Sequence, residues 1–150
     1  MSAFDPQAFL DTQVTEVNDT RVVPCPVGEW PATADNVDIK SGVSQKTGEP
    51  WTRLNVKWKI EGCDANRLAD RDPIYVTQGV MLDLSANGGL DMGKGKNVQL
   101  GRLREALDLN QAGRPFSFRM LIGRTGKVAV THREYEGNMF DEVKGVVRLG

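Results

Sequence analysis

The sequence predicts a small, mostly β domain that contains one helix. Three observations support this fold class. The chain has 150 residues, the length of one domain. Two of its segments alternate strictly between apolar and polar residues, and only one long segment has helical spacing. Because Pro24 and Pro26 stiffen the chain and keep it out of helix, we expect an N-terminal arm over residues 1–24 and a single folded domain over residues 25–150.

The predicted strands are recognised by apolar side chains at every second position. The clearest one runs from Trp51 to Glu61, where the other alternate positions are mostly basic. A first strand is expected over residues 28–40 and a third over residues 74–84, with a polar, turn-like connection over residues 62–72. The second and third strands are predicted to bury Leu54, Val56, Trp58, Ile60, Ile74, Val76, Val80, Leu82 and Leu84.

The helix and the remaining strands follow a glycine-rich loop over residues 87–96. Asn97 is expected to cap a helix of about a dozen residues, and Leu100, Leu103 and Leu107 lie near helical spacing on its buried face. Residues 116–122 and 127–135 are strand-like and are separated by a turn. The acidic segment 134–142 is predicted to be a hairpin loop, and residues 142–149 a last short strand.

This order of elements predicts a five-stranded Greek-key barrel, the OB-fold, with the helix between strands 3 and 4. The strands of this barrel and the loops between them bind oligonucleotides or oligosaccharides. Several other small antiparallel barrels have a similar order of elements, so the order alone does not establish that the sheet closes.

The net charge of −1 hides an asymmetry along the chain. Residues 1–50 hold three Lys or Arg and eight Asp or Glu, a net charge of −5, and residues 51–150 carry +4. Between Lys94 and Arg133 there are nine basic and two acidic residues, a net charge of +7. Such a local excess indicates an anionic partner, and the alternative is a solvated basic face.

Two strand faces combine aromatic and basic side chains, the pattern that a single nucleic-acid strand requires. Basic groups neutralise its phosphates, and aromatic rings stack on its unpaired bases. One face carries Trp51, Arg53, Lys57 and Lys59; the alternative reading is that its lysines protect a sheet edge from aggregation. The predicted nucleic-acid-binding residues are Trp51, Arg53, Lys57, Lys59, Tyr75, Lys94, Lys96, Arg119, Arg124, Lys127, Arg133 and Tyr135.

No arrangement of residues predicts catalysis. The single histidine, His132, shares the core-like face of its strand, where a packed or hydrogen-bonded role is expected. Cys25 and Cys63 are expected to be structural thiols. The segment from Gly88 to Lys94 fits seven positions of a phosphate-binding loop, but Gly95 stands where a hydroxyl must hold magnesium. We therefore expect no enzyme, no metal and no cofactor.

Four short motifs are spread over the chain after residue 20. They are Pro26-x-Gly28-x-Trp30-x-Ala32, Thr47-Gly48-x-x-Trp51-x-x-Leu54-x-Val56-x-Trp58, Leu100-x-x-Leu103-x-x-Ala106-Leu107-x-Leu109 and Glu142-Val143-Lys144-Gly145. Together they resemble a family of small proteins from phage and prophage replication modules, which are regarded as OB-fold proteins that bind single-stranded DNA.

The resemblance implies a viral protein that coats single-stranded DNA during replication or recombination, without turnover, in the cytoplasm of a bacterial host. The expected partners are single-stranded DNA and phage replication or recombination proteins. A homodimer is also compatible with this interpretation, and no membrane is expected because the chain lacks an apolar run of about 18–20 residues. The alternative is an adaptor or accessory barrel of a viral assembly, in which the acidic first third of one subunit pairs with the basic remainder of another.

Overall fold

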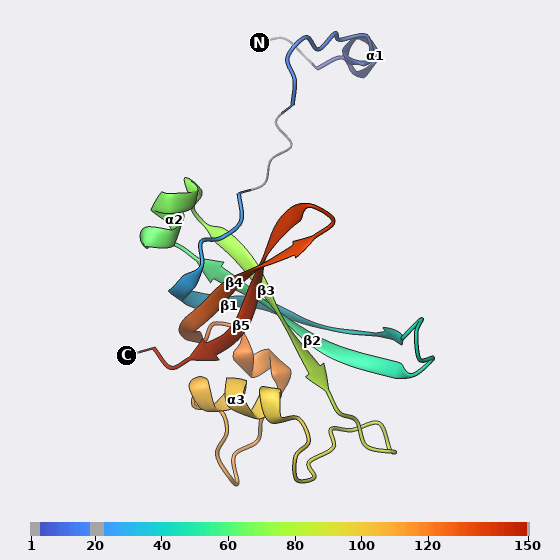
Figure 1. The fold of residues 1–150 in the computed structure, drawn as a ribbon, viewed down its shortest axis with the longest axis vertical. Helices are drawn as coiled ribbons and strands as arrows, with labels where there is room; N and C mark the ends of the chain where they lie inside the picture. The colour runs from blue at the N-terminus through green and yellow to red at the C-terminus, as the bar shows by residue number, and fades with distance from the viewer. Residues whose placement is uncertain (1–3, 19–22, 150) are drawn as a thin grey trace.

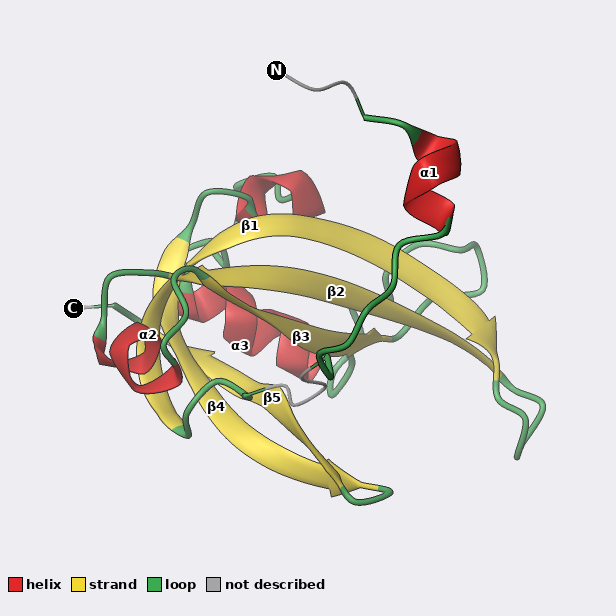
Figure 2. Cartoon of the chain, turned by 90° about the horizontal axis from the view of Figure 1, so that it is seen from above, coloured by secondary structure: helices red, strands yellow, loops and turns green. Residues whose placement is uncertain are grey.

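The chain folds around one curved antiparallel sheet. A computed structural model describes residues 4–18 and 23–149. The strands are β1 (Gly28–Val43), β2 (Pro50–Ile60), β3 (Ile74–Leu82), β4 (Thr125–Tyr135) and β5 (Asn138–Val147), in the spatial order β3-β2-β1-β4-β5. Within the described residues the two outer strands, β3 and β5, have no ladder between them, but the sheet curves until their Cα atoms come within 8 Å of each other (Figures 1 and 2).

The hydrophobic core lies inside this curve, on the face of the sheet that the alternation of apolar and polar residues in β2 and β3 predicted. The predicted core residues of β2 are fully buried, and four of the five predicted for the third strand are buried as well. Leu84 is the exception. It lies beyond the end of β3 and is 47% exposed, because the chain has already turned there into the loop that leads to the next helix.

The prediction of a single helix is wrong. α3 (Val98–Ala106) follows β3 and buries Leu100 and Leu103, but the described residues also form α1 (Pro6–Leu10), α2 (Asp64–Ala69) and the 3-10 helix η1 (Phe118–Leu121). α2 replaces an expected turn and η1 replaces an expected strand. None of these helices is long and apolar enough to cross a lipid bilayer.

α2 forms because a buried asparagine closes the connection between β2 and β3. The side-chain amide of Asn66 donates hydrogen bonds to the carbonyl oxygens of Ile60 (2.8 Å) and Arg71 (3.0 Å). Its Oδ1 accepts a hydrogen bond from the backbone N–H of Cys63 at 3.1 Å. One side chain thus satisfies three backbone groups, which a polar loop of this length would otherwise leave to water.

The last hairpin is longer than the sequence indicated. β5 begins at Asn138, and the turn consists of Glu136 and Gly137, whose φ angles are 50° and 78°. A two-residue turn with both φ angles positive matches the twist of the strands that it joins. The expected loop over residues 134–142 is therefore mostly paired strand.

Residues 4–18 of the N-terminal arm do not pack against the hydrophobic core. Residues 4–18 are exposed throughout, and in Figure 1 α1 stands well away from the sheet. Phe4 and Phe9 of this segment pack against each other, with their ring centroids 5.2 Å apart. Residues 1–3 and 19–22 of the predicted arm, and Gly150, lie outside the described residues.

Candidate functional site

Five of the predicted site residues lie on the outer face of β2 and β3. Because neighbours along a strand point to opposite sides, burial of the apolar residues of β2 turns Trp51, Arg53, Lys57 and Lys59 outward. The register places Lys59 opposite Tyr75 on β3, so the tyrosine joins the same face. The alternation read from the sequence therefore brings these five side chains together.

Two cations on this face lie over aromatic rings. The guanidinium carbon of Arg53 is 5.4 Å from the centroid of the Trp51 ring, and Nζ of Lys57 is 4.4 Å from that of Tyr75. A cation over an aromatic face gains about 0.5–1 kcal/mol at an exposed site. These contacts restrict where the two long basic side chains extend over the sheet.

Two glycines make room for the first of these pairs. A Cβ atom on Gly42 would lie 2.7 Å from the Trp51 ring, and one on Gly79 would lie 3.1 Å from Cδ of Arg53. The indole therefore lies against the bare backbone of β1, and the arginine stem lies against that of β3. Any side chain at either position would have to displace them.

The same face contains a shallow basic groove of about 270 Å³. Three cations line it, Lys40, Arg53 and Lys57, against one carboxylate, that of Asp38. Among the described residues, no carboxylate lies within 4.0 Å of the three cations. Nε of Arg53 is buried and is the one buried side-chain nitrogen or oxygen in the described chain without a hydrogen-bond partner. A buried donor without a partner is costly, but an anion from outside does not reach this nitrogen. The unpaired positive charge of the guanidinium is what suits Arg53 to an anionic partner.

No family model matches the chain, and a search of curated proteins finds no matching relative.

The other predicted site residues lie elsewhere. Lys94 and Lys96 are exposed in the loop before α3, and Arg119 lies in η1. Arg124 and Lys127 lie just before and at the start of β4, and Arg133 and Tyr135 lie near its other end, beside the last hairpin turn. In Figure 1 that hairpin and the loop before α3 occupy opposite ends of the body. Lys59 itself is partnered, with Nζ 3.7 Å from the carboxylate of Glu61.

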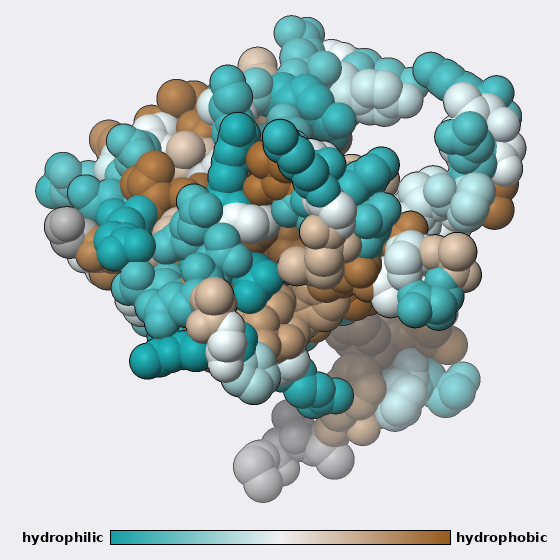
Figure 3. All heavy atoms as spheres, turned by 90° about the horizontal axis from the view of Figure 1, so that it is seen from below, coloured by the Kyte–Doolittle hydropathy of each residue, from teal (hydrophilic) through white to brown (hydrophobic). Residues whose placement is uncertain are grey.

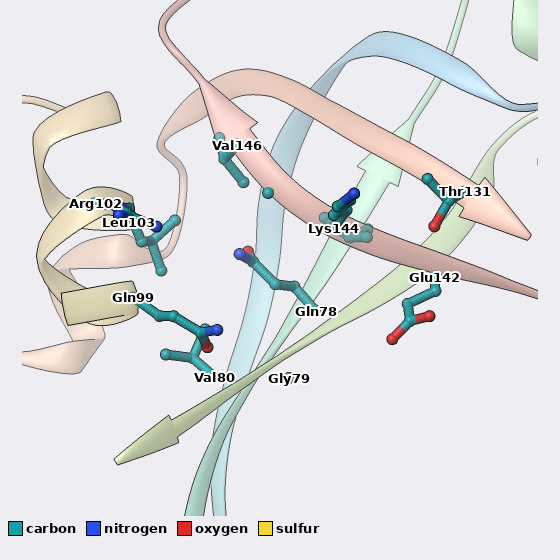
Figure 4. Close-up of a pocket in the computed structure, with 12 residues that line it drawn as sticks. Gln78, Gly79, Val80, Gln99, Arg102, Leu103, Thr131, Glu142, Lys144 and Val146 are labelled. Atoms are coloured by element: carbon teal, nitrogen blue, oxygen red, sulfur yellow. The ribbon is translucent and has the colours of Figure 1, made fainter. Parts of the chain in front are cut away.

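Sequence reasoning missed Lys40, which completes the groove. It lies directly opposite Arg53 in the register of β1 and β2. The signal was available, because a hairpin between these strands places the residues of each on a shared face, but residues 41–50 do not fix its register. Gln78, Arg102 and Lys144 were also missed. They line a second and larger cavity, of about 660 Å³, between β3, β5 and α3 (Figure 4).

His132 and Asp141 hold the segment that leads into β1. They are opposite each other on β4 and β5. A carboxylate oxygen of Asp141 accepts the backbone N–H of Cys25 at 2.8 Å, and Nε2 of His132 lies 2.6 Å from the carbonyl oxygen of Cys25. His132 is exposed rather than part of the core face, but this hydrogen bond gives it the structural role that we expected.

The buried thiol of Cys25 has a perturbed acidity. Burial, and secondly the negative charge of Asp141, raise its pKa from 9.0 to about 12. Because only the thiolate is a strong nucleophile or metal ligand, this cysteine is inert near neutral pH. Both Cys25 and Cys63 are free thiols.

Proposed function

We propose that this chain is a non-enzymatic protein that binds single-stranded DNA, without sequence preference, on the outer face of β2 and β3. The observation that carries the proposal is the Arg53 guanidinium, held over Trp51 in a basic groove where no carboxylate of the described residues lies within 4.0 Å of it. The phosphates of a nucleic-acid strand supply the negative charge that this arginine lacks nearby.

The finer description of the fold belongs to the same proposal. The strand order β3-β2-β1-β4-β5, together with the close approach of β3 and β5, supports a Greek-key OB-fold barrel. Oligonucleotides bind to OB-folds over the face of strands 2 and 3. The basic groove lies on that face of this chain, which supports an oligonucleotide ligand rather than an unrelated anion.

The mechanism is electrostatic contact combined with stacking. Lys40, Arg53 and Lys57 neutralise successive phosphates, and an unpaired base stacks on the ring of Tyr75, which is 44% exposed. Trp51, covered by Arg53 on one side and by the backbone of β1 at Gly42 on the other, holds the arginine in place. Stacking on an aromatic ring contributes about 1–3 kcal/mol per base and does not depend on base identity. A duplex has already stacked its bases, so the same face binds it less tightly. The phage replication or recombination setting, and the host cytoplasm, follow from the resemblance alone.

The test is fluorescence anisotropy with labelled oligo-dT, beside a matched duplex, for the wild type and the Arg53→Gln variant. We expect the wild type to prefer the single strand. Charged hydrogen bonds contribute about 1.5–3 kcal/mol, so the variant should lose about tenfold or more in affinity. Arg114→Gln, an exposed arginine outside the groove, is the matched control and should bind as the wild type does.

Two results would count against the proposal in different ways. If the wild type binds neither DNA, the function is wrong. If it binds oligo-dT but Arg53→Gln and Arg114→Gln bind equally well, the protein binds DNA through another surface.

A protein–protein adaptor is the second candidate, favoured by the tip of the last hairpin. Tyr135, Met139 and Phe140 are exposed there, at 61%, 47% and 46%. The register places Tyr135 and Phe140 on one face of the hairpin and Met139 on the other. Neighbouring exposed apolar side chains such as Tyr135 and Phe140 are typical of protein contacts. A Phe140→Ser variant that keeps its affinity for DNA but loses self-association in analytical ultracentrifugation would assign the hairpin tip to protein contact.

A further inference from the structure

A cavity of the described chain lies between the two outer strands, β3 and β5, where no ladder joins them. Its volume is about 660 Å³, and its walls come from β3, β5 and α3. Figure 4 shows Gln78, Gln99 and Glu142 extending from three different elements toward the enclosed space. A volume of this size is typical of small-ligand pockets.

Gln78 gives this cavity a polar centre. It is only 7% exposed, and its Oε1 accepts a hydrogen bond from the indole N–H of the fully buried Trp58 at 3.0 Å. That hydrogen bond fixes the orientation of the Gln78 amide, because Oε1 is the atom that accepts it. The NH2 group is then left to donate to another partner. Among the described residues, no acceptor binds this NH2 group. An oriented donor without a partner in a cavity wall is suited to a ligand acceptor.

The remainder of the wall adds an acceptor, two cations and apolar surface. Glu142 supplies a carboxylate, and Arg102 and Lys144 supply exposed positive charges from α3 and β5. Val146, half-buried on β5, contributes an apolar patch. One oriented donor, one acceptor, an apolar patch and two cations therefore surround the same space.

We infer that this cavity binds one unpaired nucleotide, with the base inside and its phosphate on Arg102 and Lys144. The inference deepens the proposed function and rests on it. Each of the four bases presents an acceptor beside an N–H donor on its Watson–Crick edge. Gln78 and Glu142 match that pair without selecting among bases, and the edge is free only in a single strand. The apolar patch accommodates a face of an extruded base.

Gly79 connects the cavity to the basic groove. It lines the cavity, and its bare backbone also carries the stem of Arg53 on the outer face. The groove and the cavity therefore meet at Gly79, where the stem of Arg53 covers the backbone of β3. The two sites are consecutive contacts of one bound strand.

The experiment is NMR of the full chain, with 15N labelling, titrated with 5′-thymidine monophosphate and separately with oligo-dT. The indole N–H of Trp58 and the side-chain NH2 of Gln78 report the cavity. The indole N–H of Trp51 reports the groove. We expect the mononucleotide to shift the two cavity signals in a saturable manner, while inorganic phosphate does not. Oligo-dT should shift the cavity signals and that of Trp51.

A double variant, Arg102→Gln with Lys144→Gln, tests the two cations of the cavity without disturbing the core. It should weaken mononucleotide binding by about tenfold or more. It should also reduce the salt slope for oligo-dT by about 0.7, the value for one phosphate. The matched control removes two exposed cations elsewhere, Lys46→Gln with Arg114→Gln, and should leave mononucleotide binding unchanged.

The outcomes separate this inference from the proposed function. If oligo-dT shifts only Trp51, the DNA-binding function holds and the cavity inference is overturned. Absence of mononucleotide shifts, or shifts that inorganic phosphate reproduces, also overturns it. If the mononucleotide shifts the cavity signals but oligo-dT shifts neither site, the nucleotide cavity holds and the strand-binding function is wrong.

Discussion

At the scale of single residues, the Cys25 thiol makes stability depend on pH. Its pKa is raised to about 12 in the folded chain by burial and by Asp141. The unfolded chain loses this proton above about pH 9, whereas the folded chain keeps it, so the folded state binds more protons between these values. The unfolding free energy should therefore fall as pH rises through this window, by up to about 1.4 kcal/mol per pH unit.

Urea unfolding between about pH 8 and pH 11, in the presence of a reductant, measures this slope. Cys25→Ala lowers stability at every pH because it leaves a cavity, but its slope should be shallower than that of the wild type. Val128→Ala, which opens a cavity at another fully buried core position, is the control and should keep the wild-type slope. Parallel slopes for the wild type and Cys25→Ala would show that the thiol titrates normally in the folded state.

At the scale of elements, β3 leaves room for the Arg53 side chain because residue 79 is a glycine. Valine favours strands, so Gly79→Val should leave the sheet stable. Its Cβ would begin 3.1 Å from Cδ of Arg53 and force the arginine from its place over Trp51. We expect about a tenfold loss of affinity for oligo-dT, comparable to the loss of one charged hydrogen bond.

Anisotropy binding and thermal unfolding together decide this prediction. Thr125→Val, an exposed strand position on β4 outside the groove, is the control for the added apolar bulk. An unchanged affinity in Gly79→Val, with the fold intact, would mean that the position of Arg53 does not matter for binding.

The elements that could be predicted correctly from the sequence are those in which buried and exposed residues alternate. β2 and β3 alternate without interruption, and their core residues are buried as expected. α2 was missed because six residues are too few to show a helical period and its closure depends on Asn66, an interior side chain. Phe116, Phe118, Met120 and Ile122 alternate as a strand would, but η1 buries Leu121 instead.

The candidate site could likewise be predicted only where its residues share one strand. Trp51, Arg53, Lys57 and Lys59 could be assigned to one face because they share a strand. The contribution of Lys40 depends on the register of β1 with β2, and the cavity around Gln78 depends on the curvature that brings β3 near β5. Neither relation is encoded in local spacing, so neither could be read from the chain alone.

At the scale of the whole molecule, opposite charges are separated along the chain and in space. Residues 1–18 hold three carboxylates, those of Asp5, Asp11 and Glu16, and no Lys or Arg. The groove and the cavity rim are basic. The surface in Figure 3 is mostly hydrophilic, with hydrophobic residues in separate patches. The electrostatic field of these separated charges acts on an approaching nucleic acid over roughly a Debye length, about 10 Å at 0.1 M salt.

Deleting residues 1–18 should therefore change binding but not folding. The described part of this segment is exposed throughout, so the unfolding free energy should stay within about 0.5 kcal/mol of the wild type. Removal of three negative charges should raise the affinity for oligo-dT at low salt. The gain should shrink as the Debye length falls from about 30 Å at 0.01 M to about 8 Å at 0.15 M. A full-length variant with Asp5→Asn, Asp11→Asn and Glu16→Gln should show the same gain, because charge and not bulk is its cause. A gain that appears in the deletion alone, or that persists at high salt, would instead indicate that the segment blocks the groove by contact.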